Sequence, residues 1–120
     1  MNPAGYESDV VGRVVLDAGG ERIGEVSSLY LDTDTNVVSF AGVAMTRRGR
    51  RRVVFVPLDE STLGSASITV RCGKELARRA PSVRPGEVLP ADAEAALFAH
   101  YEIPYGPADA QHGHRLTPYV

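Results

Sequence analysis

The sequence predicts a mainly β protein with a helical C-terminal part, and three stretches carry this prediction. In residues 10–17, Val10, Val14 and Leu16 share one parity while Arg13 lies on the other, which is the two-residue period of a half-buried strand. Residues 17–20 read DAGG, and paired glycines favour a tight hairpin turn. Residues 66–72 alternate cleanly between apolar and polar side chains, whereas residues 91–101 are good helix formers.

Residues 22–32 are predicted to be the return strand of the first hairpin. Their apolar residues do not keep a single parity, and a bulge near Gly24 or Ser27 reconciles the pattern with a strand. The spacing of Ile23, Val26 and Tyr30 also fits a helix. We reject the helix because Gly24 would cost its interior about 1 kcal/mol relative to Ala, and because the glycine turn already requires a strand partner.

Two further strands are predicted over residues 37–45 and 52–58. Between them, residues 47–51 are predicted to form a loop around Gly49. Both parities of 52–58 are apolar, so this strand is expected to be covered on both faces. Pro57 cannot donate a ladder hydrogen bond and marks the strand's end, an edge or a bulge. The polar stretch 32–36 is predicted to be a solvated turn, because Val37 and Val43 stand where a calcium loop needs Gly and Glu.

The C-terminal part is predicted to contain two helices and an extended connector. Residues 74–80 form a short helix stopped by Pro81, and the connector then runs to Pro90. Leu89 gives the second helix, residues 91–101, a weak cap. Its packing face is predicted to comprise Ala93, Ala96, Leu97, His100 and Tyr101. The predicted organisation is a loose lead-in (1–8), a β unit (9–73), a helical extension (74–105) and a flexible tail (106–120).

Composition is typical of one soluble globular domain. The chain has 120 residues, 43% of them hydrophobic and 23% charged, and a net charge of −2. It has no apolar run of about 18 residues, and its first residues show neither a cationic start nor an apolar signal core. We therefore expect a cytoplasmic protein with no membrane insertion. The single cysteine, Cys72, agrees with a reducing compartment and is interpreted as a half-buried apolar side chain.

The chain resembles the PRC-barrel domain family, which is named for the cytoplasmic domain of the photosynthetic reaction centre H subunit. The resemblance spans about residues 9–105, and its order and spacing are more specific than any one motif. The residues that carry it are Gly12, Asp17, Gly20, Gly24, Val26, Tyr30, Asp32, Phe55, Val56, Pro57, Leu58, Ala80, Pro81, Glu94, Leu97, Tyr101 and Tyr105. It implies a small, strongly bent barrel of about six short strands, whose hairpins close on themselves, with a C-terminal helical segment against it. The arginine-rich segment and Leu89 depart from the family pattern.

No pattern in the sequence indicates catalysis. The chain has no G-x-S-x-G elbow and no glycine-rich phosphate loop. His112 and His114 could form a chelating pair, but they lie in a stretch rich in Gly and Pro, and a zinc site needs three or four ligands. His100 is interpreted as a polar flank of the terminal helix. We therefore expect no enzymatic activity, no metal site and no cofactor.

The sharpest surface feature is the run of Arg47, Arg48, Arg50, Arg51 and Arg52. These guanidinium groups either keep a hairpin tip soluble or clamp phosphates or an acidic partner. The resemblance implies a docking domain without enzymatic activity, and we expect it to bind a protein. A homodimer is also expected, because apolar residues on both parities of the third and fourth strands exceed what one barrel covers. The alternative function is RNA or ribosome binding through the arginine run; a small-ligand carrier is disfavoured, because a small barrel is filled by its own side chains.

Overall fold

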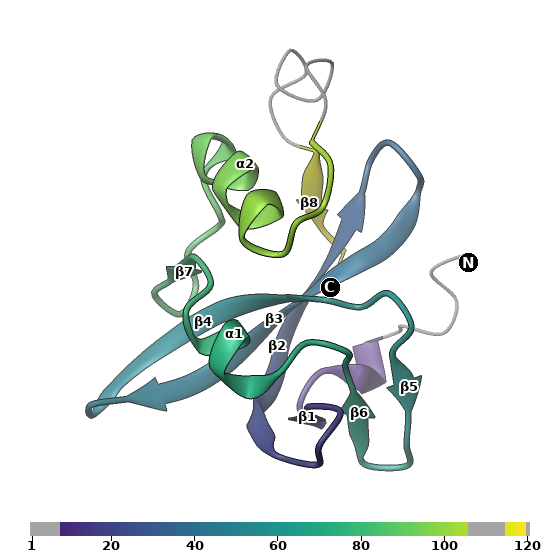
Figure 1. Ribbon diagram of the computed structural model, residues 1–120, viewed down its shortest axis with the longest axis vertical. Coiled ribbons are helices and arrows are strands. Elements are labelled where there is room, and N and C mark those ends of the chain that lie inside the picture. Colours follow the sequence, from purple (N-terminus) through teal and green to yellow (C-terminus); the bar gives the residue numbers. More distant parts are fainter. Residues whose placement is uncertain (1–7, 106–114, 120) are drawn as a thin grey trace.

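A computed structural model describes residues 8–105 and 115–119 of the chain, and their main element is one bent β-sheet (Figure 1). A 3₁₀ turn at Ser8–Val10 leads into the sheet. The strands and helices are, in chain order, β1 (Val14–Leu16), β2 (Arg22–Asp32), β3 (Val37–Arg47), β4 (Arg50–Pro57), β5 (Thr62–Leu63), β6 (Ser67–Thr69), α1 (Lys74–Arg78), β7 (Ser82–Val83), α2 (Ala91–His100) and β8 (Leu116–Pro118). The prediction of a mainly β protein with a C-terminal helix is confirmed.

The sheet is more extensive than the small closed barrel that the resemblance implies. Among the described residues it has eight strands in the order β5-β6-β1-β2-β3-β4-β7, with β8 paired to β2. The two end strands of this order, β5 and β7, do not pair with each other, so the sheet stays open. The expectations of about six strands and of closure are corrected accordingly. Three of the eight strands, β5, β7 and β8, have only two or three residues each. Strands this short show no apolar pattern by which the sequence could reveal them.

Strand β2 carries the predicted irregularity at both expected places. Against β1, the register passes from Arg22 to Gly24 and leaves Ile23 unopposed. Against β3, it passes from Val26 to Ser28 and leaves Ser27 unopposed. Each extra residue bends the strand and increases its twist. As a result, the first part of β2 pairs with β1 and its last residues pair with β8.

Gly24 is required by the close approach of β3. A Cβ atom at this position would lie 2.2 Å from the backbone oxygen of Ala44 and 2.9 Å from a methyl carbon of Val43. Any larger residue would therefore push β3 away from the bulged part of β2. Gly12, just before β1, donates its N–H to the carbonyl oxygen of Val26 at 2.8 Å. Two of the residues that carry the family resemblance thus hold β2 in its bent path.

Asp17 fastens the first hairpin to α1. One oxygen of its carboxylate accepts the backbone N–H groups of Gly19 and Glu21, each at 2.9 Å, and the other accepts the N–H of Lys74 at 3.0 Å. Gly20, with φ of +87°, completes the turn that these bonds enclose. The hydrogen bond from Glu21, helped by those from Lys74 and Gly19, lowers the pKa of Asp17 below its ordinary value of 3.8.

Because the pKa of Asp17 is lowered in the folded state, part of the free energy of unfolding depends on pH. Because the folded state holds the ionised form, this contribution is fully present above the ordinary pKa of 3.8 and is lost as the pH falls through the lower folded value. We expect Asp17→Asn to reduce the free energy of unfolding at neutral pH and to flatten its decline below pH 4. Urea titrations from neutral to acid pH measure both effects. Glu60→Gln, at an exposed carboxylate, is the control, and an unchanged acid limb in Asp17→Asn would contradict this role.

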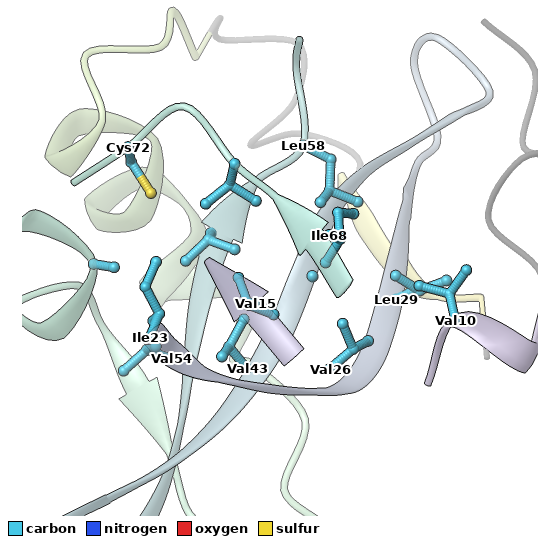
Figure 2. Close-up of a cluster of buried hydrophobic side chains, with 14 of the residues drawn as sticks. Val10, Val15, Ile23, Val26, Leu29, Val43, Val54, Leu58, Ile68 and Cys72 are labelled. Carbon is cyan, nitrogen blue, oxygen red and sulfur yellow. The ribbon is translucent and has the colours of Figure 1, made fainter. Parts of the chain in front are cut away.

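One face of the central strands β2, β3 and β4 packs against β1, β6 and α1 (Figures 1 and 2). Val43 and Val54 come from the central strands, while Val15 and Ile68 come from the covering pair β1 and β6, which runs parallel. Ala77 of α1 and Cys72 complete the cluster. Val15 and Ile68 are fully buried, so this first core is closed by β1 from the N-terminal part of the chain and by β6 and α1 from its middle.

The opposite face of the same strands carries a second core. Phe40 and Phe55 belong to it, together with Leu97 and Phe98 of α2. Helix α2 lies on this side of the sheet (Figure 1). The prediction that β4 is covered on both faces is therefore confirmed, with Val54 and Val56 in the first core and Val53 and Phe55 in the second. The hydroxyl of Tyr101 donates to the carbonyl oxygen of Phe55 at 2.7 Å, which ties the end of α2 to β4.

The expected connector and tail both contain packed strands. In the connector, β7 pairs with β4 through Val83 and Val53, and Leu89 is buried in the second core. Pro90, not Leu89, occupies the N-cap position of α2, and it makes no side-chain capping hydrogen bond, so the cap is weak as predicted. In the expected tail, β8 pairs with β2 and buries Leu116; residues 106–114, including His112 and His114, lie outside the described residues. A two- or three-residue strand gives no period in the sequence, so these elements could not be predicted from apolar spacing.

Helix α2 begins as predicted, and its packing face is confirmed in part. Leu97 is buried and Ala93 and Tyr101 pack against the second core, whereas Ala96 is exposed. Glu94 and Phe98 are also buried and have the i, i+4 spacing of a helix face, although they are not in the predicted set. His100 lies at the edge, where its Nε2 is 2.7 Å from the carbonyl oxygen of Leu76 in α1.

Glu94 is fully buried because it binds the backbone of β8. One carboxyl oxygen accepts the N–H of Arg115 at 2.8 Å and the hydroxyl of Tyr105 at 3.0 Å, and the other accepts the N–H of Leu116 at 3.0 Å. The Arg115 side chain lies over the ring of Phe98 at 4.8 Å and binds both carboxyl oxygens of Asp32 at 3.0 and 3.1 Å. Helix α2, strand β8 and the end of β2 are therefore joined by one buried polar network.

We expect Glu94→Gln to weaken the attachment of β8. An amide group replaces one acceptor oxygen with a donor, which then faces a backbone N–H, and a buried unmade hydrogen bond costs about 1–3 kcal/mol. Thermal unfolding measures the loss of stability, and hydrogen exchange at Leu116 and Tyr119 measures the release of β8. Glu102→Gln, at an exposed position, should change neither; protection of β8 that survives Glu94→Gln would refute the assignment.

Candidate interaction surface

The arginine run lies at the tip of the β3–β4 hairpin, which projects from the body of the protein (Figure 1). Arg47 and Arg50 are the last pair of the ladder, so only Arg48 and Gly49 form the turn. Both have positive φ, 53° and 77°, which is the geometry of a two-residue type I′ turn. The predicted five-residue loop is thus corrected to a tight hairpin, with four of the five arginines on its strands.

Strand alternation divides the arginines between two faces of the hairpin. Arg50 and Arg52 are two residues apart and share a face with Arg47, which stands opposite Arg50. Arg51 points to the other face. This division could not be predicted while the run was interpreted as a loop, because a loop has no regular alternation.

One face of the hairpin forms a pocket of about 320 Å³ with the end of α1 and with β7, and we call it the hairpin pocket. Its lining is Met45, Arg47, Arg48, Arg50, Arg52, Val54, Arg78 and Ser82. The lining thus includes basic side chains from both hairpin strands and from α1, and no acid. Met45 and Val54 supply its apolar part.

Arg52 is fixed in the wall of the hairpin pocket by β7. Its Nε and Nη2 donate to the hydroxyl oxygen of Ser82 at 3.1 and 2.8 Å, and Nη2 also donates to the Ser82 carbonyl oxygen at 3.3 Å. Arg47 reaches the carbonyl oxygen of Arg78 at 3.5 Å. The pocket is therefore braced by contacts between segments about 30 residues apart, which sequence inspection could not detect.

The other face of the hairpin borders a larger groove of about 540 Å³ beside α1, which we call the α1 groove. Its basic residues are Arg22, Arg51, Lys74 and Arg78. Arg22 pairs with Glu25 at 3.0 Å and Arg78 with Glu75 at 3.3 Å, so this groove is partly neutralised. Lys74 and Arg78 share a helix face by their four-residue spacing; that spacing was the signal in the sequence that could have added them to the site.

Acidic residues gather at the opposite end of the same strands. Asp32 and Asp34 flank the β2–β3 turn, and Asp59 and Glu60 follow β4. Arg115 and Arg71 pair with these acids. The turn residues 33–36 are exposed, as predicted for a solvated turn, whereas Asp32 at the end of β2 is buried. Charge is therefore distributed unevenly along the long strands, with basic residues at the hairpin tip and acidic residues at the other end.

Cys72 and His100 do not line the hairpin pocket or the α1 groove. Cys72 is buried in the first core, and burial raises the pKa of its thiol to about 11, so the thiolate is scarce at neutral pH. Burial likewise raises the pKa of the Tyr101 phenol. Within the described residues there is no group of three or more His, Cys, Asp and Glu side chains placed to hold a metal.

The residues that carry the family resemblance occupy structural positions. Val26, Phe55 and Leu97 are buried in the two cores. Pro57 ends β4, and Leu58 follows it into the first core, where its N–H binds the carbonyl oxygen of Ser39 at 2.8 Å. Pro81 follows α1 and precedes β7. None of the residues that carry the resemblance lines the hairpin pocket.

The fold and this surface define a small β domain built on a bent sheet, with a basic hairpin instead of a recognisable reaction centre in the residues described. The family model of the PRC-barrel domain matches residues 5–77. The chain therefore belongs to the PRC-barrel domain family. The match is shorter than the resemblance drawn from the sequence and ends before β7, α2 and β8.

A search of curated proteins found none that matches the chain. None of the helices in the described residues has the length and apolar character that crossing a membrane requires.

Proposed function

We propose that the protein is a docking domain that binds an acidic surface of a protein partner through its basic hairpin. The family supports an interaction domain in general terms. The observation that carries the finer proposal is the projecting tip, where Arg47, Arg48, Arg50 and Arg51 are all exposed. No enzymatic step is part of the proposal.

The arrangement of charge at the tip supports binding rather than solubility alone. Arg47 and Arg50 stand directly opposite each other, and like charges in that position destabilise a hairpin. Arg48, Arg50 and Arg51 form no ion pair with another described residue. A protein that needed charge only to protect an edge could place one or two lysines there without this repulsion. An acidic partner would supply the missing counter-charges.

RNA binding through the same arginines is less well supported. Proteins that bind single strands combine a basic groove with aromatic side chains on which bases stack. No aromatic residue lines the hairpin pocket or the α1 groove, and four of the described aromatic rings, Tyr30, Phe40, Phe55 and Phe98, are buried in the second core. A protein partner therefore fits the surface better than an RNA strand.

Affinity capture with single-arginine variants tests the docking proposal. We expect wild-type protein to retain partners that Arg50→Ala and Arg51→Ala retain about tenfold less, because each change removes a charge-assisted contact. Retention should also fall as salt rises, since exposed charges are screened. Captured proteins identified by mass spectrometry should present acidic segments.

Arg71→Ala is the matched control, because it removes one exposed arginine that pairs with Asp59 and Glu60 outside both basic surfaces. It should leave capture unchanged. Equal capture by all three variants would reject the hairpin as the docking surface. Loss of the captured material after nuclease treatment would instead favour the RNA alternative.

The homodimer expected from the sequence stays a prediction. It was predicted because β3 and β4 are apolar on both faces. In the structure, α2, β7 and β8 of the same chain cover the second face. The docking proposal does not depend on self-association. Sedimentation velocity at rising concentration distinguishes a 12.9 kDa monomer from a dimer.

A further inference from the structure

We propose that the hairpin pocket binds a phosphate monoester carried by a side chain of the protein partner. The inference rests on the proposed docking function and names the group that the basic surface recognises. It concerns the pocket formed by β3, β4, α1 and β7, and not the α1 groove.

The charge of the pocket exceeds what one carboxylate can neutralise. Its lining comprises five arginines, Arg47, Arg48, Arg50, Arg52 and Arg78, and no acidic side chain. From outside this lining, Glu75 pairs with Arg78 at 3.3 Å and Glu87 interacts electrostatically with Arg52. The other three arginines of the lining form no ion pair with a described residue. A phosphate monoester brings a charge of about −1.5 to −2 and three acceptor oxygens. It therefore suits this cluster better than the side chain of Asp or Glu.

The positions of the arginines allow several of them to reach one tetrahedral group. Arg50 and Arg52 are two residues apart on β4, and Arg47 faces Arg50 across the ladder. Neighbouring strands are about 4.8 Å apart, which places these guanidinium groups within reach of a common anion. Arg78 contributes from α1, on another wall of the pocket. One guanidinium group can donate two parallel N–H hydrogen bonds to a phosphate.

Part of the pocket is built before any ligand arrives. Ser82 binds the Arg52 guanidinium through both its hydroxyl and its carbonyl oxygen, and the Arg78 carbonyl oxygen accepts from Arg47. Such bracing reduces the ordering cost of binding. Met45 and Val54 make part of the wall apolar, and charge interactions are stronger beside apolar surface than in bulk water.

A protein-borne phosphate is favoured over a nucleotide or an RNA strand. The pocket has a volume of about 320 Å³ and no aromatic side chain in its lining on which a base could stack. The chain also lacks a glycine-rich phosphate loop. The recognised group is therefore the phosphate itself, with apolar contact from its carrier side chain.

NMR titration of the ¹⁵N-labelled full chain tests the inference. The probes are blocked phosphoserine, blocked glutamate, inorganic phosphate and a short single-stranded RNA, all at one ionic strength. We expect saturable shifts at Arg47, Arg50, Arg52 and Ser82 with phosphoserine, and affinity for blocked glutamate about tenfold lower. Arg47→Gln and Arg50→Gln should each weaken phosphoserine binding about tenfold, whereas Arg71→Gln should not.

The outcomes separate this inference from the docking proposal. Equal affinity for phosphoserine and glutamate would overturn the phosphate inference while leaving docking to an acidic partner intact. The same holds if phosphoserine gives no saturable shift but Arg50→Ala still loses the captured partners. Tighter binding of inorganic phosphate than of phosphoserine would overturn the claim that the recognised phosphate is carried by a protein side chain. Tighter binding of RNA at the same residues would overturn both proposals in favour of nucleic acid.

Discussion

The structure depends on one constraint, which is that its central strands are apolar on both faces. In β4, Val54 and Val56 need cover on one side, while Val53 and Phe55 need it on the other. Burial of such side chains contributes roughly 1.5–3 kcal/mol each, so a single covering layer would leave several of these contributions unmade. Strands β1 and β6 and helix α1 supply the first cover, and α2, β7 and β8 supply the second. The cover therefore comes from a segment that precedes the central strands in sequence and from several that follow them.

The second cover is fixed by buried polar contacts as well as by apolar area. Glu94 binds the backbone of β8, and Arg115 reaches from β8 to Asp32 at the end of β2. The PRC-barrel match ends at residue 77, so the segment that covers the second face lies outside the matched region. Asp32 belongs to the matched region and Arg115 does not, and their ion pair joins the two. The same cover brings β7 against β4, where Ser82 holds Arg52 in the hairpin pocket.

The sequence was sufficient where local pattern decides structure. The bulges of β2 followed from an uneven apolar parity, the two-sided burial of β4 from its continuous apolar run, and the start of α2 from its composition. Contacts between segments that are far apart in the chain could not be predicted from the sequence. Glu94 looked like a favourable charge at the start of a helix, and nothing local indicated that it would bind β8. The arginines of the hairpin were identified, but Arg78 and Ser82 were not, since only folding brings α1 and β7 beside the tip.

A chain shortened to residues 1–77 tests the central claim most directly, because it keeps the PRC-barrel match and removes the second cover. The account predicts that this chain loses cooperative unfolding and exposes the face that carries Phe40 and Phe55, with poor dispersion of its amide resonances and strong binding of a hydrophobic dye. A shortened chain with well-dispersed resonances and the urea midpoint of the full chain would contradict it. That result would mean that the sheet is stable with one face uncovered.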